Sequence, residues 1–218
     1  MKYKAVIAGA SGLIGGLLLE RLLNHPAYDE VLVLARKKLS TQHAKLTQVM
    51  VDFDRLDDYQ NQINGHALFC CLGTTKSKTP DLNIYRKIDH DYPVQLAKIA
   101  AKNSIPQYHL VSALGADKTS SIFYSKLKGE TEEDIKVITL YSIHIYQPSL
   151  LTGKRQENRP AERMAMSLAK WIDPLLIGQL KKYRSINADI VAQAMINQSL
   201  KNISGTFTYP SDQIKKLA

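Results

Sequence analysis

Cysteine is scarce in this chain of 218 residues, and long apolar runs are missing. The two cysteines, Cys70 and Cys71, are adjacent in an apolar stretch, so neither a disulfide framework nor a metal site is expected. This usage is typical of a reducing cytosol, and we expect a cytoplasmic location. No stretch of about 18 apolar residues predicts a membrane span. The basic and apolar start of the chain holds a glycine turn, which favours a strand and helix over a secretory signal.

Acidic residues are outnumbered, and the formal net charge is +9. Such a balance raises the question of nucleic-acid binding. The sequence has no recognition-helix pattern, aromatic ribonucleoprotein motif or zinc finger, so we expect no nucleic-acid partner and read the charge as a solvated basic surface that favours phosphorylated ligands. The length predicts a single α/β domain over residues 1–218, in which about 150–218 add a small cap and a final helix or strand.

The first strand, loop, helix and second strand form the most informative stretch, Tyr3–Arg36. Tyr3–Ala8 predicts a short apolar strand, a glycine-rich turn follows at once, and a leucine-rich helix and the strand Val31–Ala35 complete the unit. A βαβ unit of about 30 residues with a glycine-rich first turn is the arrangement that binds a dinucleotide. A helix entry with packing glycines alone is the plainer alternative.

The glycines of this turn have separable predicted roles. Gly9 allows a tight turn out of the strand. Gly12 lets backbone approach a pyrophosphate, which the free N–H groups of the helix start attract. Gly15 allows the helix to pack closely on the strand. The cofactor-binding residues expected here are Gly9, Ser11, Gly12, Leu13, Ile14 and Gly15.

Arg36 and Lys37 stand where the second strand ends, the position that selects between the two nicotinamide cofactors. An acidic side chain there would bind the ribose hydroxyls of NAD, whereas a guanidinium suits the 2′-phosphate of NADP. We therefore predict NADP (NADPH) as the cofactor. A solvated basic turn is the alternative.

Further strands alternate with helices along the chain, which predicts a doubly wound parallel sheet. The expected strands are Gln48–Val51, Ala67–Leu72, Tyr108–Ser112, Ser142–Gln147 and Thr206–Tyr209. The expected helices are Asp54–Gln62, Leu82–Asn103 with a kink or break near Tyr92 caused by Pro93, Phe123–Lys136, Ala161–Trp171, and Ala188–Leu200 capped by Asn187.

Several residues at strand ends are further candidates for cofactor contacts. Asp52 can accept a hydrogen bond from the adenine amino group and Phe53 can donate from its backbone, although Asp52 can equally cap the next helix. Gly73 permits close backbone approach, and the hydroxyls of Thr74 and Thr75 can reach ribose or phosphate. Pro148, which ends the strand Ser142–Gln147, completes this set.

Tyr124 and Lys128 lie four apart on an expected helix and hence on one face. The helix follows the strand that ends at Ser112, at the carboxyl edge where an open α/β sheet binds its ligand. A tyrosine pKa near 10 is too high for efficient proton exchange near neutrality, and a lysine one turn away favours the phenolate. We predict Tyr124 as proton donor, Ser112 as the group that polarises a carbonyl, and Lys128 as a holder of the nicotinamide ribose. The plain alternative has Lys128 in an exposed pair with Glu132.

The glycine spacing with Ser112 and the Tyr124–Lys128 pair resembles the atypical short-chain dehydrogenases/reductases, and more narrowly their Tat-interactive protein oxidoreductase branch. The shared stretches run from Phe69 to Thr75, Gly115 to Lys118, Lys128 to Glu130 and Arg155 to Pro160. The resemblance implies a Rossmann fold with strand order 3-2-1-4-5-6-7, NADP binding and a Ser–Tyr–Lys site. The chain starts directly at its first strand, so no partner role carried by the N-terminal extension of animal relatives is expected.

The leading hypothesis is an NADP(H)-dependent oxidoreductase of a small carbonyl substrate, acting as a monomer or homodimer without membrane or metal. A nucleotide-sugar epimerase or dehydratase shares the core, although about 70 C-terminal residues and Arg36 argue against it. An NADPH-sensing interaction protein is the alternative from another class. The candidate substrate pocket is formed by Thr75, Leu114, Leu151, Met164 and Trp171.

Overall fold

A computed structural model describes residues 2–153, 173 and 176–218. Seven strands form a parallel sheet in the order β3-β2-β1-β4-β5-β6-β9. Their bounds are β1 Tyr3–Ala8, β2 Tyr28–Ala35, β3 Leu46–Met50, β4 Ala67–Cys70, β5 Gln107–Val111, β6 Ser142–Gln147 and β9 Gly205–Pro210. The order confirms the expected Rossmann topology, since β9 takes the seventh place. The two short strands β7 (Leu151–Thr152) and β8 (Ile186–Asn187) pair with each other outside this sheet.

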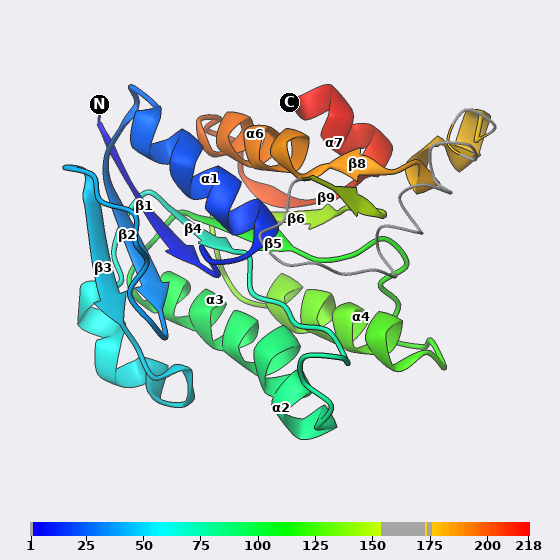
Figure 1. Cartoon of the computed structure of the whole chain (residues 1–218), viewed down its shortest axis with the longest axis horizontal. Coiled ribbons are helices and arrows are strands. Elements are labelled where there is room, and N and C mark those ends of the chain that lie inside the picture. The colour runs from blue at the N-terminus through cyan, green and yellow to red at the C-terminus, as the bar shows by residue number, and fades with distance from the viewer. Residues whose placement is uncertain (1, 154–172, 174–175) are drawn as a thin grey trace.

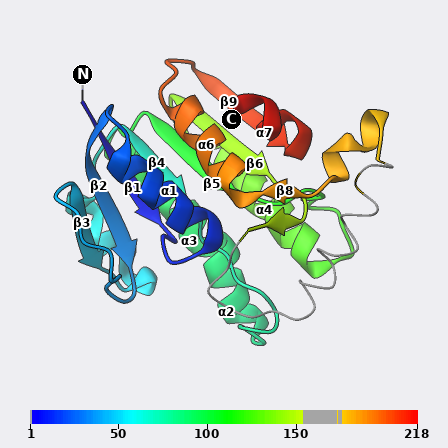
Figure 2. The ribbon, with the colours of Figure 1, turned by 45° about the horizontal axis from the view of Figure 1, so that its top comes forward.

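Helices cover both faces of the sheet (Figures 1 and 2). One face carries α1, α6 and α7, and the opposite face carries α2, α3 and α4 (Figure 1). Their bounds are α1 Leu13–Asn24, α2 Leu82–Arg86, α3 Tyr92–Lys102, α4 Phe123–Lys136, α6 Ala188–Ser199 and α7 Ser211–Leu217. Two 3₁₀ segments, Phe53–Gln62 and Gly178–Tyr183, and a π-helical segment, Lys87–Asp91, complete the described elements. None of the described helices is long and apolar enough to cross a bilayer.

The core divides into two apolar layers, one on each side of the sheet. Ile7 and Phe69 face the layer beneath α1 and α6, whereas their neighbours Val6 and Leu68 face the layer beneath α3. Successive side chains of a strand point to opposite faces, so a strand covered on both sides is apolar throughout. All four residues are fully buried.

Most element boundaries differ little from expectation, and the exceptions have local causes. β2 begins at Tyr28 rather than Val31, because its polar start pairs with β1 through Tyr3 and Lys4. The segment Phe53–Gln62 is 3₁₀ with a non-helical Arg55 rather than a regular helix. At the kink or break expected near Tyr92, a π-helical segment joins α2 to α3, and the backbone stays helical through Asp91 and Tyr92 with Pro93 in the first turn of α3. The expected helix Ala161–Trp171 lies outside the described residues.

Candidate active site

Two glycines of the first turn are required by the packing of the backbone itself. Gly9 has a φ of +90°, and a Cβ there would lie 2.5 Å from the carbonyl oxygen of Cys71. A Cβ on Gly15 would lie 2.2 Å from the carbonyl oxygen of Gly9. Both distances are far below van der Waals contact, so α1 approaches β1 and the end of β4 as closely as glycine alone allows.

Gly12 differs from these two, because backbone packing within the protein does not require a glycine at this position. It is exposed, has an ordinary φ of −82°, and a Cβ would meet only the Gly9 carbonyl oxygen at 3.3 Å. It is the N-cap of α1, and no side chain caps this helix start. Uncapped N–H groups at a helix start beside exposed glycine fit the pyrophosphate of a dinucleotide. Of its neighbours, Ser11 is exposed, Leu13 half-buried and Ile14 buried.

A second group of residues gathers at the ends of β2 and β3. Arg36 and Lys37 are exposed there. Asp52 accepts a hydrogen bond from the N–H of Asp54 at 3.0 Å, which is the capping role weighed for it. Tyr92 donates to the carboxylate of Asp54 at 2.9 Å.

Arg36 is close enough to Tyr92 for its positive charge to affect the pKa of the tyrosine. Burial and the bond to Asp54 raise the pKa of Tyr92 to about 12, while Arg36 acts in the opposite direction. Phe53 packs against the Tyr92 ring with centroids 5.5 Å apart. Arg36, Phe53 and Tyr92 therefore lie near one another, although Tyr92 is far from the other two in sequence.

Lys128 is buried, which contradicts the exposed pairing with Glu132 weighed as the plain alternative. Its side chain is 6% exposed, and its Nζ lies 2.9 Å from Oδ1 of Asp89, whose side chain is 1% exposed. The other oxygen of Asp89 accepts from the N–H of Thr74 at 2.8 Å. A Cβ on Gly73 would lie 3.6 Å from Asp89 Oδ1 and 3.9 Å from Lys128 Nζ, so this glycine leaves space beside the ion pair.

Tyr124 lies near the start of α4, one turn before Lys128, and is 41% exposed. Desolvation of its hydroxyl is the largest cause of a raised pKa for Tyr124, which Lys128 opposes and Asp89 reinforces. Burial alone would lower the pKa of Lys128, but Asp89, followed by Tyr124, outweighs it and raises that pKa. In the protein alone the lysine thus does not bring the tyrosine pKa below its ordinary value.

Ser112 is buried directly after β5, and its hydroxyl donates to Oε1 of Glu132 at 2.5 Å. Glu132, on α4, also accepts from the side-chain amide of Gln147 at 2.9 and 3.0 Å, and Lys136 lies 3.8 Å away. Sequence reasoning did not identify Glu132 as a partner of Ser112. The hydroxyl proton expected to polarise a carbonyl is engaged by a carboxylate in this structure.

Two of the stretches on which the resemblance was based, Gly115–Lys118 and Lys128–Glu130, meet at α4. A Cβ on Gly129 would lie 2.1 Å from the backbone nitrogen of Lys118, and the N–H of Asp117 donates to the carbonyl of Ser125 at 2.9 Å. The loop after β5 therefore packs directly against α4. This contact sets the position of Tyr124 and Lys128, on α4, relative to Ser112 at the end of β5.

The remaining candidates surround the strand ends. The hydroxyl of Thr74 bonds that of Thr79 at 2.8 Å, and the hydroxyl of Thr75 bonds that of Ser77 at 3.0 Å. Pro148 accepts from the N–H of Leu114 at 3.0 Å, so these two candidates lie side by side. Leu151 is half-buried in β7. Met164 and Trp171 lie outside the described residues.

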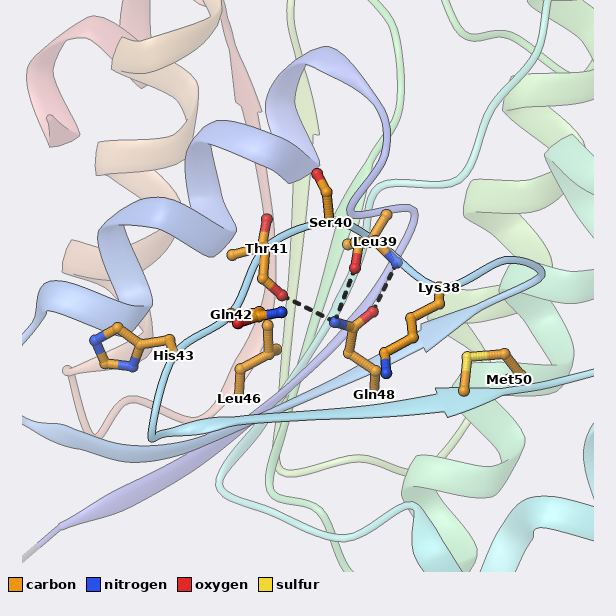
Figure 3. A pocket seen from close by; sticks show the side chains of 9 residues that line it. All are labelled: Lys38, Leu39, Ser40, Thr41, Gln42, His43, Leu46, Gln48 and Met50. Carbon is orange, nitrogen blue, oxygen red and sulfur yellow. Dashed lines mark hydrogen bonds between the residues drawn. The ribbon is translucent and has the colours of Figure 1, made fainter.

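A surface cavity lies elsewhere, at the edge of the sheet beside β3 (Figure 3). Its volume is about 700 Å³, and it is lined by Lys38, Leu39, Ser40, Thr41, Gln42, His43, Leu46, Gln48 and Met50. The Gln48 side chain accepts from the N–H of Leu39 and donates to the carbonyl of Thr41, which holds the loop in place. The cavity contains none of the predicted substrate-pocket residues. Among the described residues, no cluster of His, Cys, Asp and Glu could hold a metal ion.

The uncapped glycine turn and the parallel sheet define a dinucleotide-binding protein of the Rossmann class. A family model described as NAD(P)H-binding matches residues 9–139, and the chain belongs to this NAD(P)H-binding family. Protein HTATIP2 of Rattus norvegicus is 35% identical over 170 residues, which are 76% of this chain and 70% of the rat protein. Protein fmp52, mitochondrial, of Aspergillus clavatus is 31% identical over 217 residues, 95% of this chain and 92% of the fungal one. These relatives support the atypical short-chain dehydrogenase/reductase branch.

Solved structures resemble the chain at the level of the fold. The Bordetella bronchiseptica enzyme WbmG in complex with NAD superposes with a TM-score of 0.71 at 16% identity, over 99% of this chain and 76% of that one. The Thermus thermophilus UDP-glucose 4-epimerase complex with NAD gives a TM-score of 0.71 at 13% identity, over 98% and 80%. At such identity the likeness defines the fold and not the substrate.

Proposed function

We propose that this protein is an NADP(H)-dependent reductase of a small carbonyl compound. The observation that carries the proposal is the buried Lys128, whose ammonium lies beside Gly73 at the carboxyl edge of the sheet, one helical turn after Tyr124. A lysine costs free energy to bury, and here it is retained next to a tyrosine at the edge where this fold binds its cofactor. Family membership supports the nucleotide, and Arg36 supports the phosphorylated form.

The residues of the chain have distinct tasks in this proposal. The uncapped start of α1 at Gly12 holds the pyrophosphate, and Arg36 binds the 2′-phosphate. Lys128 reaches the nicotinamide ribose. NADPH, when bound, supplies the hydride that reduces the carbonyl carbon. Tyr124, which is partly exposed, donates the proton to the carbonyl oxygen.

Ser112 has to exchange partners during this reaction. Its hydroxyl donates to Glu132 in the structure, so it polarises a carbonyl only after rotating toward the substrate. Glu132 keeps both bonds from Gln147 when Ser112 turns away, so the buried carboxylate does not lose all its donors. The exchange therefore costs one hydrogen bond and gains another.

The first test measures cofactor choice. NADPH and NADH are titrated into the purified protein by calorimetry, with the wild type and Arg36→Ala. NADPH is expected to bind at least about tenfold more tightly, and Arg36→Ala is expected to remove this margin of about 1.4 kcal/mol. Arg55→Ala is the matched control, since Arg55 is an exposed guanidinium paired with Asp58. Equal binding of NADH, or NAD retained through purification, would contradict the NADP assignment and favour epimerase-type chemistry.

The second test concerns the reaction. A screen of carbonyl compounds with NADPH follows oxidation of the cofactor, and Tyr124→Phe is the control that lacks the proposed proton donor. Turnover that Tyr124→Phe abolishes supports the reductase. A cellular effect that survives Tyr124→Phe but is lost in Gly12→Asp would instead support an NADPH-sensing interaction protein. A cytoplasmic location remains a prediction from the cysteine content. The fungal relative is named as a mitochondrial protein, so mitochondria are the compartment to compare.

A further inference from the structure

Asp89 is a buried carboxylate that the proposed reaction does not use. It lies in the π-helical segment Lys87–Asp91, between α2 and α3. One oxygen lies 2.9 Å from Nζ of Lys128, and the other accepts from the N–H of Thr74 at 2.8 Å. The two side chains of the ion pair are 1% and 6% exposed. The Asp89 carboxylate is therefore held in position by Thr74, in the loop after β4, and by Lys128 on α4.

Three other ionisable groups surround the pair from the elements packed against it. Tyr124 is on α4 with Lys128, Tyr85 is on α2, and Cys70 ends β4. Tyr85 donates to the carbonyl of Thr74 at 3.1 Å, and burial raises the pKa of Tyr85, with Asp89 adding to the effect. Burial also raises the pKa of the Cys70 thiol. Tyr85 and Cys70 are thus neutral near pH 7. Among the groups around the pair, the charges that act on Tyr124 are therefore those of Asp89 and Lys128.

We propose, on the basis of the reductase function above, that Asp89 is a positioning residue that offsets part of the charge of Lys128 and so adds to the desolvation that favours the phenol form of Tyr124. An isolated ammonium would stabilise the phenolate, whereas a carboxylate at 2.9 Å from that ammonium acts on the phenol with the opposite sign. The pair also holds Lys128 in one place beside Gly73.

The consequence is a site prepared for reduction. In that direction the O–H bond of Tyr124 breaks and an O–H bond forms on the substrate oxygen, while the carbonyl carbon accepts the hydride from NADPH. Tyr124 then recovers a proton from water. A resting phenol is the reactant form for this direction, and a resting phenolate is the form that alcohol oxidation needs. Asp89 therefore favours the protonation state of Tyr124 that the reduction step uses.

The experiment titrates Tyr124 in the cofactor-free protein by carbon-13 NMR of labelled tyrosine rings, with Tyr124→Phe used to assign the resonance. Asp89→Asn is expected to lower the pKa of Tyr124 by about one unit or more. Asp134→Asn is the matched control, because Asp134 is a carboxylate on the same helix as Tyr124 that bonds His90 at 2.9 Å. An Asp89→Asn titration that coincides with the wild type overturns the proposal.

A second variant covers the case in which Asp89→Asn fails to fold with an unpaired buried ammonium. Asp89→Asn combined with Lys128→Met removes both charges, and the pKa of Tyr124 is expected to stay within about one unit of the wild-type value. A larger rise would show that Lys128 dominates despite Asp89 and would overturn the proposal. Because neither titration uses cofactor or substrate, a failed carbonyl screen would count against the reductase function and leave this result standing.

Discussion

Acidification from pH 7 to pH 5 is expected to destabilise the fold through a ladder of stacked rings inside the sheet. Phe69, His109, His144 and Phe207 are register partners on β4, β5, β6 and β9. The imidazoles of His109 and His144 stack with centroids 4.5 Å apart and planes within 6°. Both histidines are fully buried. A proton on either ring would place a positive charge in the apolar layer beneath α6.

The magnitude follows from the pKa of His144. Burial, with a smaller contribution from Lys201, lowers the pKa of His144 to about 4 from its ordinary 6.5. The unfolded chain therefore binds more protons than the folded one between these values, and stability falls as the pH drops through 6.5. The whole shift corresponds to about 3.4 kcal/mol, of which about 2 kcal/mol is lost between pH 7 and pH 5. Burial also lowers the pKa of His109, which acts in the same direction.

Urea unfolding followed by circular dichroism at pH 7 and pH 5 measures this loss. His144→Gln removes the titrating group while keeping polar atoms for Ser142 and Tyr209, the partners of the imidazole at 2.7 and 3.0 Å. The variant is expected to lose about 2 kcal/mol less than the wild type between the two pH values. His43→Gln, at an exposed histidine, is the control and should behave as the wild type. Equal pH dependence in His144→Gln and wild type would refute the reasoning.

Three further predictions follow from single contacts. Gly15→Ala is expected to destabilise the protein by about 1–3 kcal/mol or more, because its Cβ would lie 2.2 Å from the Gly9 carbonyl oxygen. Gly16→Ala, with its nearest contact at 3.4 Å, should melt close to the wild-type temperature, and similar melting of the two variants would contradict this packing. Glu132→Gln is expected to cost about 2 kcal/mol in urea unfolding, because Ser112 and Gln147 lose a charged acceptor; an unchanged midpoint would contradict it. Gly73→Val is expected to weaken NADPH binding about tenfold or more in calorimetry, and undiminished affinity would show that the cofactor stays away from this glycine.

The geometry of the glycine turn was predicted well because its signals are local. Gly9 and Gly15 allow close backbone packing, as the sequence predicted, and Gly12 is the exposed residue at the helix start. Asn187 caps α6, with its side chain accepting from the N–H of Asp189. Such features depend on residues within a few positions of one another. Such turns and helix caps can therefore be predicted from the neighbouring residues alone, without knowledge of the rest of the chain.

The chemistry of Lys128 and Ser112 could not be predicted in the same way. Asp89 is 39 positions from Lys128, and Glu132 is 20 positions from Ser112. The Tyr124–Lys128 spacing identified the tyrosine and lysine, while the exposed pairing of Lys128 with Glu132 was the wrong alternative. No periodicity distinguishes Asp89 from its neighbour Asp91, which is half exposed.

The amino-acid sequence alone thus determined the βαβ start, the glycine turn, the parallel sheet and the Tyr124–Lys128 helix face, since periodicity and turn chemistry act over a few residues. Only the tertiary structure decided which charges meet. The π-helical segment turns Asp89 toward Lys128, and the packing of α4 against the strand ends brings Glu132 to Ser112. Charges about 3 Å apart in a buried place interact far more strongly than the same charges in water. Contacts between residues distant in sequence therefore set the protonation states on which the proposed chemistry depends.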